Sequence, residues 1–441
     1  MSDKSKSWLL FLIGLFSLTQ ISFIGYIGIA EIACYVIAPF VLWRQFSLFQ
    51  YLKLLPYLGL LTIWGVCALM VDALVYYKAM EDVLKGVAPV YSVFSVSICV
   101  IVLLHDHLRR LNWIIVGMAL SYVLSTIIFQ RGAFVGAESL MEQAQGSAME
   151  ATMSYKLYWL LLIATFAVLP AQIRFRTIPL AVSIGLVLAA AFFSLFGGGR
   201  STFLVLLVSC GLLMVGAGVR SRAYRPRPRS LVVLAILMVL MGLGARSAYT
   251  YTVKAGWLGW EEQEKYASQT KIGTSPLAFL MSGRSETFIT LLAIRDKPFL
   301  GHGSKALDLK GYCDEWVDKY GSEWDLLIAK GRRKAGILAI PVHSHILAAW
   351  LWHGLGGLLF WGYALYLIYK TLTVWMWYVP DWFGWFATVI PTWLWAIAFS
   401  PFGERVAFAV LMVAALLTRC VYKGLIPPVE RGLGGRAFMR G

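Results

Sequence analysis

The chain has 441 residues, of which 59% are hydrophobic and 14% are charged, and its mean hydropathy is +0.71. This composition excludes a soluble domain, because apolar runs near the ~20 residues that cross a bilayer recur along most of the sequence. The formal net charge of +16 would point to nucleic acid in a soluble protein. Here membrane topology explains much of the charge, so the predicted fold class is an all-α polytopic membrane protein with no nucleic-acid partner.

The apolar runs predict about twelve transmembrane helices, separated by one large and partly helical loop. The first run follows MSDKSKS and is longer than the apolar part of a signal peptide, so we interpret it as a retained helix. The predicted spans are 8–24, 27–43, 54–74, 86–104, 111–129, 156–172, 178–196, 201–219, 230–247, 344–369, 381–399 and 405–420. The chain thus divides into nine helices over 1–247, a loop over 248–343, three helices over 344–420 and a basic tail over 421–441.

Lysine and arginine gather at alternate ends of these spans. Examples are Arg109 and Arg110, Arg174 and Arg176, and the tail. Because short cytoplasmic loops carry an excess of Lys and Arg, we expect both termini in the cytoplasm and the large loop on the outer side.

The large loop combines mixed charges with interleaved aromatic residues, which is not typical of disorder. A loop of this length is uncommon unless it is functional or has structure of its own. Segments 276–296 and 313–334 have the pattern of amphipathic helices, which we expect to lie along the outer membrane interface.

Arg200 follows three glycines, in GGGRST, and precedes the predicted span 201–219. A guanidinium stays charged and offers a planar fork of donors, while glycines allow a close backbone approach. The start of the next helix adds N–H groups and a positive dipole end. Together these features predict an anion site, best suited to phosphate; the alternative is an interfacial arginine paired with a lipid headgroup or an acidic residue.

Arg284 lies in a similar setting, in MSGRSETF. Two Gly-Arg-Ser elements on one side of the membrane would suit a two-arginine clamp on a diphosphate. The alternative is a surface salt bridge, for example with Glu286 or Glu262.

Three histidines lie on the predicted outer side, and a fourth lies within the tenth predicted span. His343 and His345, in PVHSHIL, lie where the large loop enters the tenth span, and histidine is the usual proton acceptor near neutral pH. Their alternate spacing and the lack of an acidic neighbour argue against a metal site. His302, in FLGHGSKA, fits a structural turn or a substrate contact equally well, and His353 is expected to pack or make a polar contact inside the bundle.

The sequence contains no P-loop, no dinucleotide fingerprint and no Asp-x-Asp pair of the kind that holds a metal-bound sugar nucleotide. The six cysteines show no metal spacing. No cofactor or metal is therefore predicted, and an outward-facing enzyme would receive its activated donor on a lipid carrier.

Three ordered segments resemble the O-antigen ligase and polymerase superfamily of bacterial inner-membrane proteins: GGGRSTFLVLLV, SGRSETFITLLAIRDKPFLGHGSKA and VHSHILAAWLWHGLGGLLF. The resemblance covers roughly 195–360, and the spacing to Gly354 favours His343 over His345 as the family histidine. Two positions depart from the family: Trp352 stands where an acidic residue is common, and Ser344 where asparagine is commoner.

The resemblance implies a GT-C-like glycosyltransferase of the bacterial inner membrane with a periplasmic active site. The ligase branch transfers finished polysaccharide from undecaprenyl diphosphate to lipid A–core, whereas the polymerase branch joins repeat units. In the implied metal-independent, inverting reaction, Arg200 and Arg284 hold the diphosphate and His343 accepts the proton of the acceptor hydroxyl. His302 and His345 are further candidate substrate contacts.

Arg332 and Arg333 are candidate contacts for the phosphates of lipid A–core, on charge alone. The basic character and the single large loop favour the ligase over the polymerase. A lipid-linked glycan flippase remains a non-enzymatic alternative, but it would be expected to carry charges within several spans and an internal duplication. The expected partners are the lipid-linked glycan donor, the lipid A–core acceptor and membrane lipids.

Overall fold

The computed structural model describes residues 2–22, 26–128, 184–191, 200–220, 249–257, 285–320, 339–375, 383–400 and 403–426, with isolated residues between 236 and 270. The fold is mostly helical, and four helices of the described part are long and apolar enough to cross a membrane. Its elements are α1 (Asp3–Leu15), β1 (Gln20–Ser22), β2 (Tyr26–Gly28), α2 (Ile29–Arg44), α3 (Phe46–Tyr51), α4 (Leu55–Met70), the π-helical turn η1 (Val71–Val75), α5 (Met80–Leu104), the 3-10 turn η2 (Leu108–Arg110), α6 (Leu111–Ile128), α10 (Arg200–Arg220), α14 (Ser285–Asp296), α15 (Tyr312–Tyr320), α17 (His345–Trp375), α18 (Phe383–Phe399) and α19 (Arg405–Tyr422).

Most predicted spans that fall on described residues correspond to helices, but the first does not. The predicted helix 8–24 ends at Leu15, and the chain then forms the antiparallel pair β1–β2, with Gln20 opposite Gly28. The segment after Leu15, FSLTQIS, contains several polar residues, so it is less apolar than the second half of a membrane span requires. The predicted span 156–172 and most of the spans 178–196 and 230–247 lie outside the described residues.

The start of the chain is held by α6. Gly14 of α1 and Gly117 of α6 lie against each other's backbone, and a Cβ at either position would overlap the facing helix. Small residues allow this close approach of two helices, as is common where van der Waals packing drives helix association. At the same end, Lys6 and Arg110 pair with Asp106 at 2.5 and 2.6 Å.

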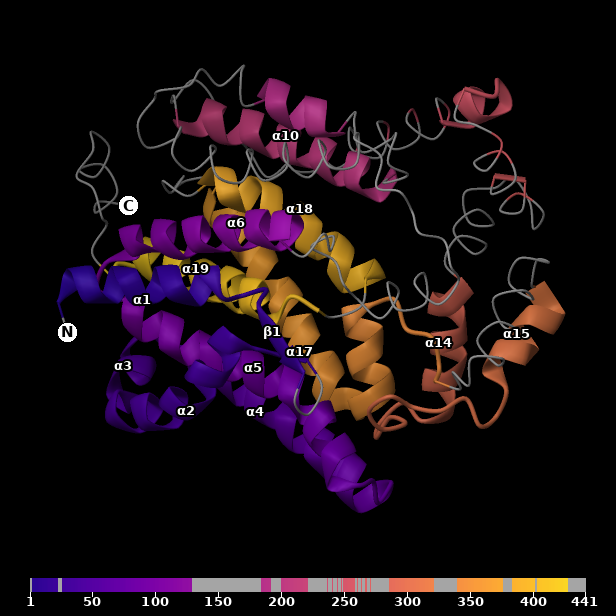
Figure 1. Cartoon of the computed structure of the whole chain (residues 1–441), viewed down its shortest axis with the longest axis horizontal. Helices are drawn as coiled ribbons and strands as arrows, with labels where there is room; N and C mark the ends of the chain where they lie inside the picture. Colours follow the sequence, from indigo (N-terminus) through magenta and orange to yellow (C-terminus); the bar gives the residue numbers. More distant parts are fainter. Residues whose placement is uncertain are drawn as a thin grey trace.

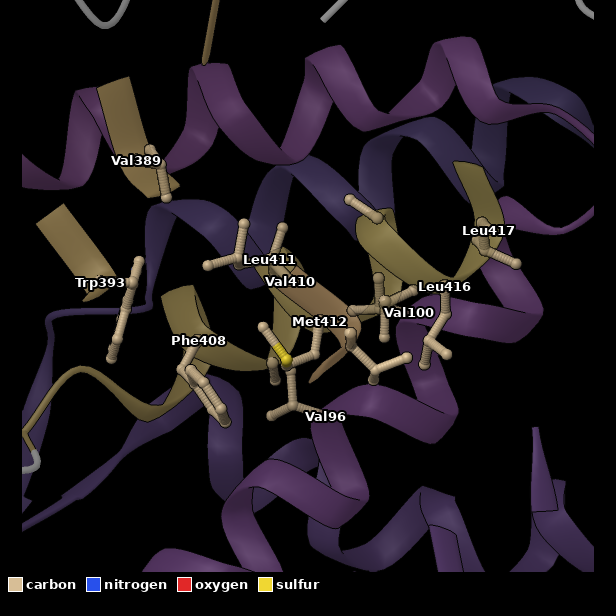
Figure 2. Packing of buried hydrophobic residues seen from close by; sticks show 14 of the residues in the cluster. Val96, Val100, Val389, Trp393, Phe408, Val410, Leu411, Met412, Leu416 and Leu417 are labelled. Carbon is tan, nitrogen blue, oxygen red and sulfur yellow. The ribbon is translucent and has the colours of Figure 1, made fainter. Parts of the chain in front are cut away.

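The centre of the bundle is formed by α5, α17 and α19. Most of α19 is buried on every side, which is typical of a central helix that is hydrophobic all round. In Figure 2 its side chains face Val96 and Val100 of α5 and Val389 and Trp393 of α18. By contrast, α4 exposes large apolar residues along one face.

The described elements separate towards two ends of the molecule. Figure 1 shows the start of α1 and α3 at one end, and α14 and α15 at the other. Four described parts of the chain share the first end, because Lys6 pairs with Asp106 and the Tyr51 hydroxyl donates to the Leu425 carbonyl at 3.2 Å. The helices of the predicted large loop, α14 and α15, occupy the second end.

Candidate functional site

The helix α17 is a hairpin rather than one continuous span. The rings of His345 and Trp361 are 5.2 Å apart, although sixteen residues of straight helix would separate them by about 24 Å. The reversal occurs at His353 (φ −124°) and Gly354 (φ 60°, ψ −142°). We call 345–352 the first leg, 355–375 the second leg and His353–Gly354 the apex. The predicted span 344–369 is thus corrected: of the two legs, only the second has the length to cross a membrane.

A glycine allows the two legs to pack closely. A Cβ on Gly357 would overlap the carbonyl group and the Cβ of Ala349, so the legs approach at backbone distance. Figure 1 shows the two legs as neighbouring orange helices beside α14. A short helical leg that turns back beside a longer one places non-helical backbone within the bundle, which is tolerated where that backbone is buried in protein or lines a cavity.

The base of the hairpin carries the predicted catalytic segment. Ser344 caps the first leg: its hydroxyl accepts from the Leu347 N–H at 3.2 Å and donates to the Ile397 carbonyl of α18 at 2.9 Å. His345 is 2% exposed and packs between Trp361 and Trp393. His343 is half-buried and precedes the leg. The two histidines therefore differ in access, and His343 is the more open of the two.

The same segment is tied to α14. The Thr290 hydroxyl, fully buried, lies 2.8 Å from the Pro341 carbonyl oxygen, and the Ile340 N–H donates to the Ala306 carbonyl at 2.8 Å. Because α14 begins immediately after Arg284, two of the three sequence elements singled out above pack together.

The third element, α10, begins at Arg200 and packs along α18, the helix that holds Ser344. Four elements are thus joined in series: α10, α18, α17 and α14. The Arg200 side chain and all of Arg284, Arg332 and Arg333 lie outside the described residues, so the placement of their guanidiniums is not part of this geometry.

The Gly-His-Gly segment clamps the apex of the hairpin. The N–H groups of His302 and Gly303 donate to the carbonyls of Leu351 and Trp352 at 2.6 and 2.9 Å, which caps the first leg. Gly301 and Gly303 both have φ near 79°, a conformation that favours glycine. A Cβ on Gly354 would overlap the Phe299 carbonyl. The motif therefore has a structural task at this place in the fold.

The His302 side chain takes part in the same turn. Its Nε2 lies 2.7 Å from the Ala293 carbonyl oxygen, and its ring meets Tyr312 edge-on. Burial lowers the pKa of His302 from its ordinary value of 6.5. The imidazole is therefore neutral near pH 7 and donates to Ala293, the contact of a turn.

A buried polar network that the sequence did not predict lies beneath this clamp. The Trp64 indole N–H donates to His353 Nδ1 at 2.9 Å, and His353 Nε2 lies 2.8 Å from Ser304 Oγ. The Ser304 N–H donates to Asp72 Oδ1 at 2.8 Å, and Lys78 pairs with the same oxygen at 2.9 Å. The signals in the sequence were a lone Asp near the end of an apolar run and a Lys six residues later.

The hydrogen bonds of this network define the tautomer of His353. Since Nδ1 accepts from the indole, the proton of the neutral ring is on Nε2 and is donated to Ser304. An imidazole in this state cannot take the serine proton, and Ser304 is 6% exposed. The Ser–His pair is therefore a structural unit and not a hydrolytic nucleophile with its base.

A second buried ion pair joins α2 to α19. Glu31, 5% exposed, accepts from the Gly28 N–H at 3.0 Å and pairs with Arg405 at 3.3 Å. Both this pair and Asp72–Lys78 lie at helix ends rather than in the middle of a span. Removing one member of such a pair typically costs about 3–5 kcal/mol, because the other charge remains buried.

Within the described part of the chain, no group of three or more His, Cys, Asp or Glu side chains is placed to hold a metal ion. The chain is a mostly helical protein with helices able to cross a membrane. Comparison with protein-family models, curated proteins and solved structures finds no match.

Proposed function

We propose that the protein is a membrane glycosyltransferase that moves a finished O-antigen polysaccharide from undecaprenyl diphosphate to a sugar of lipid A–core. The contact between Thr290 and Pro341 carries this proposal. Thr290 follows Arg284 by six residues and Pro341 precedes His343 by two, so the helix that begins after Arg284 contacts the segment that leads to His343.

The reaction needs a grip on the leaving group and an acceptor for one proton. In the proposal, Arg200 and Arg284 hold the diphosphate and neutralise its charge as the bond to the anomeric carbon breaks, and one such preorganised donor is worth about 10²–10³ in rate. The acceptor hydroxyl oxygen forms the new bond while His343 takes its proton, which contributes about 10²–10⁴. Direct displacement inverts the anomeric centre.

The environments of the two neighbouring histidines support the assignment of the base. A base must reach the acceptor hydroxyl, and His343 is half-buried, whereas His345 is enclosed by two tryptophan rings. His345 then belongs to the packing that fixes the base of the hairpin.

The proposed setting is a bacterial inner membrane with the site on the periplasmic side. Support comes from the grouping of Lys6, Arg110 and the Tyr51–Leu425 contact at one end and of α14 at the other. A flippase is less well supported, because the buried ion pairs lie at helix ends and leave the middle of each described span free of charge.

Reconstitution tests the function. The purified protein in nanodiscs is incubated with undecaprenyl-diphosphate-linked polysaccharide and lipid A–core, and the products are separated on gels. Glycan-capped core is the expected product. Longer chains that remain on the carrier, with bare core, would instead identify a polymerase. No new glycosidic bond, together with transfer of the donor across proteoliposomes, would identify a transporter.

A further inference from the structure

We propose that Asp72 is a positioning residue: through Ser304 and His353 its carboxylate fixes the apex of the α17 hairpin and thereby the place of His343 at the hairpin base. The inference rests on the proposed function for its catalytic consequence. Its structural consequence, a rigid hairpin, is measurable without any substrate.

The local backbone turns Asp72 inward. The regular helix α4 gives way to the π-helical turn η1 over Val71–Val75, and Asp72, within that turn, is fully buried. Single π-helical turns occur frequently at functional sites, where they re-aim a side chain. An ionisable group buried at the end of a membrane helix is a functional candidate whose partners must be named.

The partners of Asp72 come from two other parts of the chain. Oδ1 receives the Ser304 N–H and the Lys78 ammonium, whereas Oδ2 has no hydrogen-bond partner among the described residues. Oδ2 and Ser304 Oγ both face Gly86, where a Cβ would overlap each of them. Ser304 Oγ accepts the His353 Nε2 proton, and Ser304 reaches the carboxylate through its backbone N–H, which donates to Oδ1.

This arrangement joins four residues in series: the Trp64 indole donates to the His353 imidazole, the imidazole donates to the Ser304 hydroxyl, and the Ser304 N–H donates to the Asp72 carboxylate. Because His353 is the apex residue, these hydrogen bonds hold the apex through its side chain, while the Gly-His-Gly clamp holds it through backbone N–H groups. Buried hydrogen bonds of this kind hold the groups that they join in one arrangement.

The position of the apex in turn affects the position of the other end of the first leg. The first leg is a short rigid helix whose length is about 12 Å for eight residues, so a tilt at the apex moves its other end. At that end the bond from Ser344 to Ile397 and the contact of Pro341 with Thr290 define where His343 sits. A displacement of about 1 Å at a catalytic group costs about 10²-fold in rate.

The decisive comparison is Asp72→Asn against Glu31→Gln. Both variants neutralise a buried, ion-paired carboxylate, but Glu31 joins α2 to α19 and touches no part of the hairpin in the described contacts. We expect Asp72→Asn to lower kcat per folded molecule by about 10²-fold with KM for both lipids unchanged, and Glu31→Gln to leave kcat unchanged. Ser304→Thr, which keeps a hydroxyl, should retain more kcat than Ser304→Ala.

Hydrogen exchange of the peptide 340–352 in nanodiscs supplies the readout without substrate. Faster exchange in Asp72→Asn than in Glu31→Gln is expected. Equal exchange and equal kcat in the two variants would overturn the positioning role even if the wild type makes capped core. Should the wild type form no glycosidic bond while the exchange difference is present, the function fails and the positioning of the hairpin stands. If Asp72→Asn does not fold, Lys78→Met in the same pair and Ser304→Ala must show the faster exchange, and its absence in both refutes the role.

Discussion

The base and the apex of the α17 hairpin present histidines in three different environments. His343 at the base is half-buried, His345 is enclosed by Trp361 and Trp393, and His353 at the apex is held by two hydrogen bonds. Three imidazole rings within eleven residues therefore differ in their access and in their hydrogen-bond partners. The environment supplied by remote segments, rather than residue type, separates a candidate base from two structural groups.

The largest expected effect tests this contrast at the base. His343→Ala should lower glycan transfer by about 10²–10⁴ with the melting temperature near that of the wild type, because the side chain is only half-buried. Transfer by the reconstituted protein and thermal unfolding in detergent are the measurements. In the matched variant His345→Ala, we expect lower stability with kcat per folded molecule largely retained. An active His343→Ala beside an inactive, folded His345→Ala would reverse the assignment.

The next effect concerns the cationic element attached to the base. Arg284→Lys keeps the charge but loses the planar fork, so transfer should fall by about 10²–10³. The comparison is Arg295→Lys at the other end of α14, where the side chain is 70% exposed beside Asp296. The measurement is the rate of glycan transfer by each reconstituted variant. Comparable rates in the two variants would argue against a bidentate clamp.

At the apex the expected effect is on stability. Gly354→Ala places a Cβ in a positive-φ conformation against the Phe299 carbonyl, which we expect to lower the free energy of unfolding by about 3 kcal/mol. Gly362→Ala, where nothing lies within reach of the added Cβ, is the control and should be neutral or slightly stabilising. Thermal unfolding of both variants in detergent is the measurement; equal melting temperatures would contradict the close approach at the apex.

The smallest effect is a pH dependence of the clamp. Because burial lowers the pKa of His302, the unfolded chain binds the proton more readily than the folded one. The contribution of the neutral His302 ring to the free energy of unfolding is therefore complete above the pKa of the unfolded chain, about 6.5. It is lost as the pH falls towards the lower pKa of the folded state. His302→Gln keeps a donor for Ala293 but does not titrate. Melting temperatures from pH 8 to 5 should fall less in this variant than in the wild type, and parallel curves would exclude the effect.

Several features of the fold followed from the sequence, and the reasons are local. Runs such as 54–74 and 111–129 are mostly apolar, so the α4–η1 segment and α6 begin and end within a few residues of the prediction. The helix α14 lies inside the predicted amphipathic segment 276–296, and α15 overlaps the start of the segment 313–334. Hydropathy, however, does not show where an apolar segment changes direction. The prediction therefore missed both the end of α1 at Leu15 and the reversal of α17.

The candidate site, like the fold, was predicted from the sequence only in part. His343 and its distance from Gly354 are properties of the sequence, as is the order of the three Gly-, Arg- and His-containing segments. The buried polar contact of His353 was expected from the sequence and is confirmed, but its partners escaped prediction because Asp72, Ser304 and His353 are far apart in the chain. Even the Gly-His-Gly motif showed its structural task only when its N–H groups met the end of the first leg.

By itself the sequence determined that this is a helical protein with apolar segments able to cross a membrane, and it limited the candidates for chemistry to a few polar residues, because burial in lipid requires long apolar helices. Only the tertiary structure decided which of those side chains are accessible, since access depends on the packing of distant segments. The hairpin in α17 is the clearest case: two residues with non-helical angles direct a helix back on itself and bring the Thr290–Pro341 contact and the Asp72 network to opposite ends of one short leg.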